Sequence, residues 1–176
     1  MYPVLHPSDT DVSVLVNAVY EDRPKFLDIW MEFMREELKA GSHIHATTKN
    51  LINYANYFDA YTNGQMFGAC LFWMEQPWDT PQAVVMAGED FKTEGWDTDR
   101  PSQATLWGAY VRPEFRGRNI GKEVKCNVYL ELLKLGFSHV ETRVRVNNKV
   151  GHRTALTLGL ELESHLYVGD LKEIVK

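Results

Sequence analysis

The segment 111–122 combines glycines with basic side chains in a pattern that suits a bound anion. Gly117 and Gly121 lie in a turn between an apolar run at 104–111 and an amphipathic stretch at 120–135. The first N–H groups of a helix have no partner within it, and the helix dipole adds positive charge there, so such a turn can hold a phosphate. The basic residues between positions 112 and 125 are Arg112, Arg116, Arg118, Lys122 and Lys125. The pattern predicts a phosphate cradle, although a glycine turn that opens a helix is also common without a ligand.

The string from Tyr110 to Lys122 resembles motif A of the GNAT N-acetyltransferases, whose pattern is Arg/Gln-x-x-Gly-x-Gly/Ala. Arg116, Ile120 and Gly121 match the motif directly. Asn119 stands where the family usually has its middle glycine. Asparagine tolerates a left-handed backbone better than other non-glycine residues, so the departure is mild.

A second stretch is similar to motif B of the same family, Asn-x-x-Ala…Gly-Phe. The run Val-Asn-Asn at 146–148 is followed by Gly-Leu at 159–160. The order of the expected elements, from residue 2 to the closing hairpin, also follows the family plan. The resemblance covers most of the chain, with its sharp motifs at 104–162 and with the segment 75–102 outside it.

The resemblance implies acetyl-coenzyme A as the co-substrate, held in a gap between two splayed strands, and no metal. By similarity, the pantetheine arm would pair with the backbone near Tyr110 and Val111 and would touch Asn148. The pyrophosphate would bind the amides of residues 116–122. The implied cofactor-binding residues are Tyr110, Val111, Arg116, Gly117, Arg118, Asn119, Ile120, Gly121, Lys122 and Asn148.

Acetyl transfer needs a neutral amine, donors for the oxyanion and a proton for the departing thiolate. In the family a tyrosine on the motif B helix often gives that proton, whereas this chain has Ala155 at that spacing. A thiol ionises near pH ~8.5, so a thiolate can leave without help. His152 is our candidate acid and Glu141 our candidate base. The structural alternatives are a packing role for His152 and an ion pair between Glu141 and its arginine neighbours.

The charge of the chain is divided unevenly along its length. Residues 1–100 hold 16 acidic and 7 basic side chains, whereas residues 101–176 hold 8 and 12. The net charge of −5 disfavours a general nucleic-acid or membrane binder, but the basic excess coincides with the phosphate cradle. The acidic half would line the acceptor side in this fold, so we expect a cationic primary amine, either a small molecule or a protein amino group. A merely solvated acidic surface is the alternative.

Alternating strands and helices must position these groups, which makes the fold class α/β. The apolar run at 104–111 and the alternation at 139–146 predict strands, and the stripe at 120–135 predicts a helix between them. A short helix at 148–158 and a closing hairpin around residues 169–170 complete this half. We expect a GNAT-like mixed, mostly antiparallel sheet that is splayed between its two central strands and flanked by helices.

The first half of the chain is less sharply marked. The spacing of apolar residues predicts helices at 9–19, 22–41 and 48–57. The dipeptide Asn63-Gly64 predicts a hairpin that joins strands at 58–62 and 65–74. Residues 75–102 are rich in Pro, Gly, Asp and Trp and predict an acidic loop insertion, in which a strand fits only at 83–86.

The length and cysteine content predict a single domain over residues 1–176 in a reducing, cytoplasmic setting. Cys70 and Cys126 are too few and too far apart for a disulfide framework or a zinc site. No stretch is long enough to span a bilayer. A homodimer is left open.

These observations favour an acyltransferase that moves an acetyl group from acetyl-CoA to a primary amine by direct attack in a ternary complex. The alternative is a weakened or inactive protein of the same fold that binds CoA or a partner protein, because Ala155 and Asn119 depart from the family pattern. Nucleic-acid modification would require the basic stretch at 112–125 to be exposed instead of occupied by a cofactor.

Overall fold

The computed structural model describes residues 13–41, 46–75, 80–89, 103–145 and 147–162. The chain divides into two compact units, residues 1–143 and residues 144–176. The first unit contains β1 (Ser13–Asn17), η1 (Tyr20–Asp22), α1 (Arg23–Lys39), α2 (Thr48–Thr62), β2 (Gly68–Glu75), β3 (Ala83–Gly88), β4 (Gln103–Val111), η3 (Pro113–Phe115), α3 (Ile120–Lys134) and β5 (His139–Thr142). The second contains α4 (Lys149–Thr157). The single-domain organisation stays a prediction.

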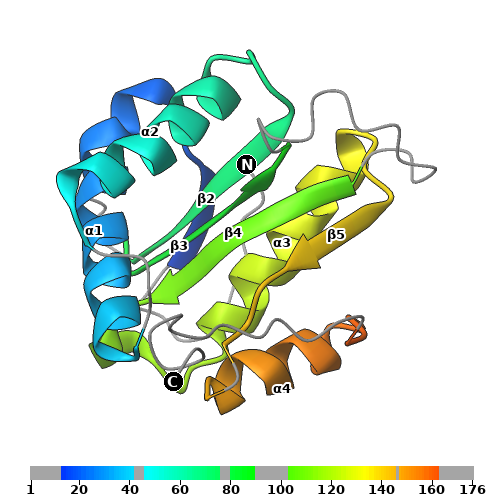
Figure 1. Cartoon of the computed structure of the whole chain (residues 1–176). Helices are drawn as coiled ribbons and strands as arrows, with labels where there is room; N and C mark the ends of the chain where they lie inside the picture. The colour runs from blue at the N-terminus through cyan, green and yellow to red at the C-terminus, as the bar shows by residue number, and fades with distance from the viewer. Residues whose placement is uncertain (1–12, 42–45, 76–79, 90–102, 146, 163–176) are drawn as a thin grey trace, which may run out of the picture. The chain divides into compact units, whose positions relative to one another are not determined.

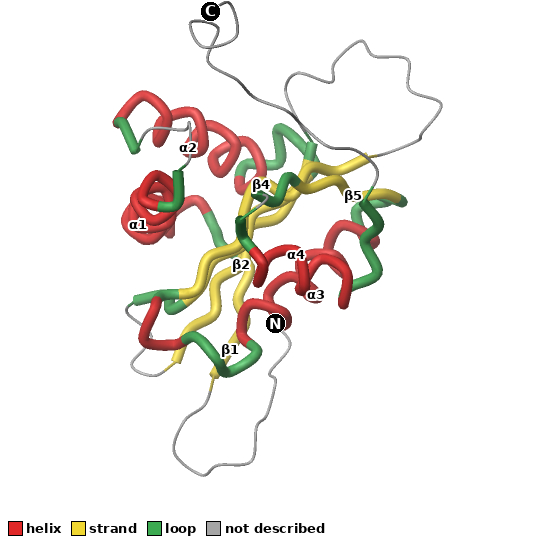
Figure 2. The backbone as a smooth tube through the Cα atoms, turned by 60° about the horizontal axis from the view of Figure 1, so that its bottom comes forward, coloured by secondary structure: helices red, strands yellow, loops and turns green. Residues whose placement is uncertain are grey.

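A five-stranded sheet separates two helical layers in the first unit. Helices α1 and α2 cover one face and α3 covers the other (Figure 1). Figure 2 shows the same sheet between the α1–α2 pair and α3. The strand order β1-β2-β3-β4-β5 follows the chain, with antiparallel pairs up to β4 and a parallel β4–β5 pair that α3 connects. The expected α/β class and mixed, mostly antiparallel sheet are confirmed.

Aromatic side chains dominate the core between the sheet and the α1–α2 layer. Phe26 and Trp30 of α1 are fully buried, and Phe26 stacks on Phe58 of α2 with ring centroids 4.5 Å apart. The predicted stripe of α1 therefore packs as a core face. Stacked aromatic pairs add about 0.5–1.5 kcal/mol each beyond the area that they bury, so this layer is firmly held.

Aliphatic side chains form the core on the opposite face. Val124, Val128 and Leu132 of α3 recur every fourth residue and are buried against the sheet. Ile120 starts this stripe at the first residue of the helix. The position of the helix N-terminus is thus fixed by a buried side chain.

Strand β4 changes register opposite Met86 and Ala87 of β3. Met86 faces Gly108, but Ala87 faces Leu106, so Trp107 is the extra residue of a bulge. A bulge reverses the alternation of side chains along a strand. A Cβ atom on Gly108 would lie 2.7 Å from the ring of Phe33 in α1, so the helix packs directly over the bulge.

The predicted hairpin at Asn63-Gly64 is wrong. Residues 58–62 form the last turn of α2, in which Phe58 and Tyr61 continue a buried helical stripe. The backbone of Gly64 is left-handed, and the Asn63 N–H donates to the Asp59 carbonyl. Asparagine and glycine suit the end of a helix as well as a tight hairpin turn, and the apolar stripe decides between them.

Two other expectations for the first half also change. Residues 13–17 of the predicted helix at 9–19 form strand β1, because the valine-rich run pairs with β2. The strand that the sequence allows at 83–86 is confirmed and runs to Gly88 as the central strand of the described sheet, so the segment 75–102 is not a loop throughout. Its remaining parts at 76–79 and 90–102, and the closing hairpin around residues 169–170, lie outside the described residues.

Among the described residues, no helix combines the length and the apolar character that crossing a bilayer requires.

Replacing Gly88 with Ala is expected to lower the free energy of unfolding by about 1–3 kcal/mol through overpacking. The new Cβ would lie 2.5 Å from the Cα atom of Gly68 and 2.7 Å from the Phe67 carbonyl oxygen, and both are backbone atoms. Urea denaturation of the purified variant measures the change. Gly121→Ala is the control, since its Cβ would lie 3.4 Å from Val111 Cγ2, an ordinary contact. Equal stability of the two variants would contradict the crowding at Gly88.

Candidate functional site

Strands β4 and β5 separate partway along β4. Their parallel pairing covers Gln103–Leu106 and His139–Thr142, whereas β4 continues to Val111. The Arg112 N–H donates to the Gln82 carbonyl at the end of β3, at 2.9 Å. A trans peptide points the Val111 carbonyl the opposite way, toward the open edge of β4. Of the two residues predicted to pair with pantetheine, Val111 turns its carbonyl to this edge, while the register directs the backbone of Tyr110 toward β3.

The turn between β4 and α3 has the backbone shape of an anion cradle. Gly117 and Asn119 both have left-handed φ angles, +81° and +62°. Asn119 thus takes the conformation for which glycine is usual. The first N–H groups of α3, from Ile120 and Gly121, have no acceptor within the helix because no turn precedes them. The Lys122 N–H, by contrast, donates to the Asn119 carbonyl, so the last amide of the predicted range 116–122 is already occupied.

Arg116 turns its side chain toward α1 and the end of β4. Its Nη2 donates to Glu36 Oε2 at 2.5 Å, and its Nε donates to the Val111 carbonyl at 2.9 Å. The guanidinium also lies 5.6 Å from the ring centroid of Tyr110. About half of the Arg116 side chain, 48%, stays exposed. The residue predicted to meet a phosphate is therefore at the turn but is bound to a carboxylate.

Arg112 fastens the same end of β4 to α1. Its guanidinium donates to both carboxylate oxygens of Glu32, at 3.0 and 2.9 Å, and to Asp28 at 3.0 Å. Only 13% of its side chain is exposed. Bidentate arginine–carboxylate pairs are among the stronger ionic contacts in proteins. Arg112 is thus a structural clamp, and not a free cation of the basic cluster.

The acidic side chains of α1 form a stripe that is absent from the predicted site. Asp28, Glu32 and Glu36 are spaced by four residues and lie on one face of the helix. The stripe meets Arg112 and Arg116, which are also four residues apart. The regular spacing of the acids was a signal in the sequence, but their partners are about 80 residues away and were not identified.

Tyr110 completes the contacts of Glu36. Its hydroxyl donates to Glu36 Oε1 at 3.2 Å, and its ring is buried between β4 and α1. Burial, followed by the negative charge of Glu36, raises the pKa of Tyr110 to about 12. The phenol therefore stays protonated at neutral pH and keeps donating to the carboxylate.

Glu141, the candidate base, lies on β5 just before the two strands separate. Its carboxylate accepts hydrogen bonds from Gln103 Nε2 at 2.9 Å and from Thr105 Oγ1 at 3.4 Å, both on β4. These neutral cross-strand partners replace the expected arginine ion pair among the contacts that it makes. Its side chain is exposed and remains open to water.

His152 and Asn148 belong to the second unit and are described within it. The Asn148 side chain caps α4 by accepting from the Gly151 N–H at 2.8 Å. His152 Nε2 lies 2.8 Å from the Arg145 carbonyl, which can only accept, so Nε2 carries a proton in this contact. In these contacts Asn148 stabilises the N-terminus of α4, and His152 links that helix to the backbone of Arg145.

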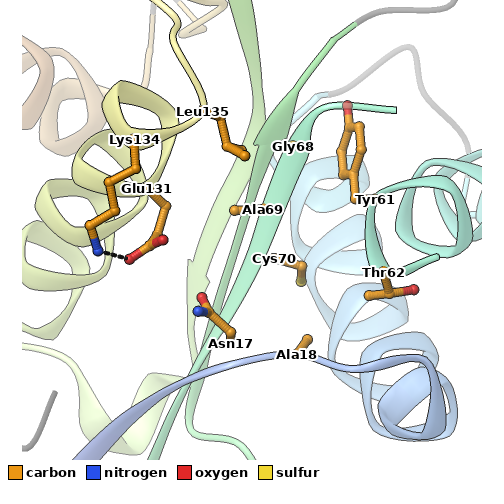
Figure 3. A pocket seen from close by; sticks show the side chains of 10 residues that line it. All are labelled: Asn17, Ala18, Tyr61, Thr62, Gly68, Ala69, Cys70, Glu131, Lys134 and Leu135. Carbon is orange, nitrogen blue, oxygen red and sulfur yellow. Dashed lines mark hydrogen bonds and ion pairs between the residues drawn. The ribbon is translucent and has the colours of Figure 1, made fainter. Parts of the chain in front are cut away.

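A separate hollow lies at the end of the sheet opposite to Val111 (Figure 3). It has a volume of about 230 Å³ and is open to solvent. Its lining includes the buried Cys70 and the Glu131–Lys134 ion pair of α3. Within the described ranges, no group of three or more His, Cys, Asp or Glu side chains could hold a metal ion.

Comparisons with known proteins agree with this geometry. The family model described as "Acetyltransferase (GNAT) family" matches residues 21–159. Among solved structures, the aminoglycoside acetyltransferase AAC(6′)-Iy with a CoA-linked bisubstrate analogue shares 12% identity, with a TM-score of 0.64 over 90% of this chain and 97% of that chain. A mutant of the BH1408 protein from Bacillus halodurans shares 13%, with a TM-score of 0.71 over 90% and 99%.

A further similar structure is AAC(6′)-Ih from Acinetobacter baumannii, at 14% identity and a TM-score of 0.61 over 90% of this chain and 97% of that chain. At such low identities the structures share the fold. No curated protein sequence matches the chain.

The raised pKa values of the buried Tyr110 and the partly buried Tyr129 predict a loss of stability in alkali. Tyr110 and Tyr129 have pKa values of about 12, against an ordinary value of 10.0, chiefly because burial disfavours the phenolate. Between about pH 10 and pH 12 the unfolded chain loses these protons and the folded chain keeps them, so the free energy of unfolding falls as pH rises.

Denaturation curves at several pH values measure this dependence. Tyr110→Phe should flatten it, because this phenol no longer titrates. A variant as steeply dependent on pH as the wild-type chain would show that Tyr110 ionises normally in the folded protein.

Proposed function

The chain belongs to the GNAT family of acetyltransferases, and from this membership we propose that it moves an acetyl group from acetyl-CoA to a primary amine. The amine would attack the thioester directly while both substrates are bound. One observation carries the proposal: β4 leaves β5 after Leu106 and ends at a left-handed turn at the N-terminus of α3. An open strand edge that leads to an anion cradle suits a long acyl carrier with phosphates at one end.

The acyl carrier fits the described residues group by group. The Val111 carbonyl, to which Arg116 Nε donates in this structure, would accept from an amide of the pantetheine arm once Arg116 turns away. The cradle would offer the N–H groups of Ile120 and Gly121 to the pyrophosphate, and Arg116 lies at its entrance with an exposed guanidinium. Asn148 stays a candidate contact through its amide N–H₂ group, since its oxygen caps α4.

A cationic amine is the acceptor that the charge distribution favours. The first hundred residues hold 16 acidic and 7 basic side chains. Negative charge draws cations toward a site and raises their encounter rate. Two of the similar proteins, AAC(6′)-Iy and AAC(6′)-Ih, are named as aminoglycoside N-acetyltransferases.

The chemical step needs few side chains. Holding the amine against the thioester accounts for up to about 7–11 kcal/mol of the barrier. Glu141 is the candidate base, because its exposed carboxylate lies where the strands diverge. His152 is the candidate acid toward the departing thiolate, and its Nδ1 atom is the one left for that role.

The alternative function is a protein that binds CoA or a partner without turnover. Ala155 replaces the usual acid, and His152 Nε2 is engaged by the Arg145 carbonyl. Both observations leave the motif B helix with few groups that could protonate the departing thiolate. The cytoplasmic location stays part of the proposal and fits the free thiols of Cys70 and Cys126.

Arg116→Glu is expected to weaken acetyl-CoA binding by about 10- to 100-fold, because the cradle loses a charge-assisted donor and gains a repulsive charge. Isothermal titration calorimetry measures the affinity, and circular dichroism checks the fold. Lys49→Glu is the matched control, since it makes the same charge change on an exposed residue of α2. Unchanged affinity in Arg116→Glu would remove Arg116 from the cofactor site.

Turnover of acetyl-CoA with a panel of polyamines, aminoglycosides and peptides is followed as release of free thiol. Binding without thiol release from any amine supports the inactive alternative. If His152 is the acid, both His152→Ala and His152→Gln should lower turnover by about 10²–10⁴-fold with little change in acetyl-CoA affinity. Glutamine can still donate to the Arg145 carbonyl but cannot deliver a proton. A loss confined to His152→Ala assigns the residue a positioning role.

A further inference from the structure

We propose that Glu36 competes with the pyrophosphate of the acyl carrier for the guanidinium of Arg116. In the protein without its carrier, Glu36 keeps Arg116 turned toward α1, and carrier binding exchanges this carboxylate for phosphate oxygens. Glu36 is thus a positioning residue that lowers the affinity of the cofactor site. The inference rests on the proposed function, because it needs a phosphate-bearing carrier at the cradle.

The direction of the Arg116 side chain is the first observation. Its backbone begins the turn, yet its guanidinium contacts Glu36 of α1 and the carbonyl of Val111. Both contacts lie on the β4 side of the turn. The same side chain therefore covers the carbonyl at the open edge and withholds its positive charge from the cradle.

The exposure of the ion pair makes the exchange feasible. The side chains of Arg116 and Glu36 are 48% and 36% exposed, so water and ions reach both groups without any unfolding. An exposed pair of this kind is weak, whereas a pyrophosphate offers several charged oxygens in the bidentate geometry that arginine prefers. The phosphate is the stronger partner, and Glu36 reduces the net gain.

Glu36 remains held after Arg116 leaves. The Tyr110 hydroxyl donates to its other carboxylate oxygen, Oε1, and burial between β4 and α1 fixes the tyrosine ring. The carboxylate therefore keeps one hydrogen-bond donor when Arg116 leaves, and the free-energy cost of the exchange stays small.

The neighbouring pair explains why α1 does not move in this exchange. Arg112 is 13% exposed and binds Glu32 through two hydrogen bonds and Asp28 through a third. This pair lies before the turn and stays closed while Arg116 moves. The two arginines on one acidic stripe thus have different tasks: Arg112 docks the helix, and Arg116 is exchangeable.

Calorimetric titration with coenzyme A tests the competition. Glu36→Gln keeps the shape of the side chain and an acceptor for Tyr110 but removes the charge. The affinity for coenzyme A should rise about fivefold, which corresponds to about 1 kcal/mol at 1.4 kcal/mol per tenfold change. Dephospho-coenzyme A keeps the pyrophosphate and lacks the 3′-phosphate, so it should gain as much.

Two further variants separate competition for Arg116 from general repulsion. Asp28→Asn removes one negative charge from the same face of α1, two turns earlier, and leaves both Glu32–Arg112 bonds in place, so it should leave the affinity unchanged. In an Arg116→Gln background, Glu36→Gln should no longer strengthen binding. An equal gain in Asp28→Asn, or a gain that persists without Arg116, would mean that the carboxylates act by long-range repulsion and would overturn the proposal.

The outcomes also separate this inference from the proposed function. A wild-type chain that does not bind coenzyme A overturns both. A wild-type chain that binds, with a Glu36→Gln variant of equal affinity, overturns the competition and leaves the acetyltransferase proposal standing. A gain with coenzyme A that dephospho-coenzyme A does not share assigns the contact to the 3′-phosphate and contradicts the pyrophosphate.

Discussion

Strand β4 pairs with two neighbouring strands, β3 and β5, over different lengths. Along β3 it keeps its pairing to the end, at Val111, whereas β5 accompanies it only to Leu106. The bulge at Trp107 comes directly after the last residue that pairs with β5. A regular strand can form a continuous hydrogen-bond ladder along both of its edges. The register shift at Trp107 therefore marks the point at which the edge of β4 that faces β5 becomes open. The turn and the first residues of α3 follow from where β4 ends.

The two arginines at the end of β4 differ in how deeply they are buried. Arg112 is enclosed and bound twice to Glu32, while Arg116 is exposed and bound once to Glu36. Enclosure strengthens an ion pair by excluding water, and exposure weakens it. The same stripe of carboxylates therefore contains one enclosed contact that fastens α1 to β4 and one exposed contact that we propose a ligand replaces.

The second half of the chain could be predicted well because its signals are local. The alternation at 139–146, the stripe from Ile120 to Leu132 and the glycine turn each indicate the local structure, although β5 covers only residues 139–142 of the predicted strand. The first half could not, because Asn63-Gly64 suits both a hairpin and a helix end, and the valines at 13–17 became a strand only by pairing with β2. Contacts of Arg112 and Arg116 with α1 join residues far apart in sequence, and no local pattern names such partners.

The anion cradle consists mainly of backbone, which has a consequence for how proteins of this kind diverge. Two left-handed residues and the first amides of a helix make few demands on side-chain identity, and Asn119 takes the left-handed conformation without being a glycine. Residues that choose an acceptor or move a proton can then drift while the carrier is still held. A lineage that inherits such a turn can change its chemistry, or abandon it, without first losing its ligand.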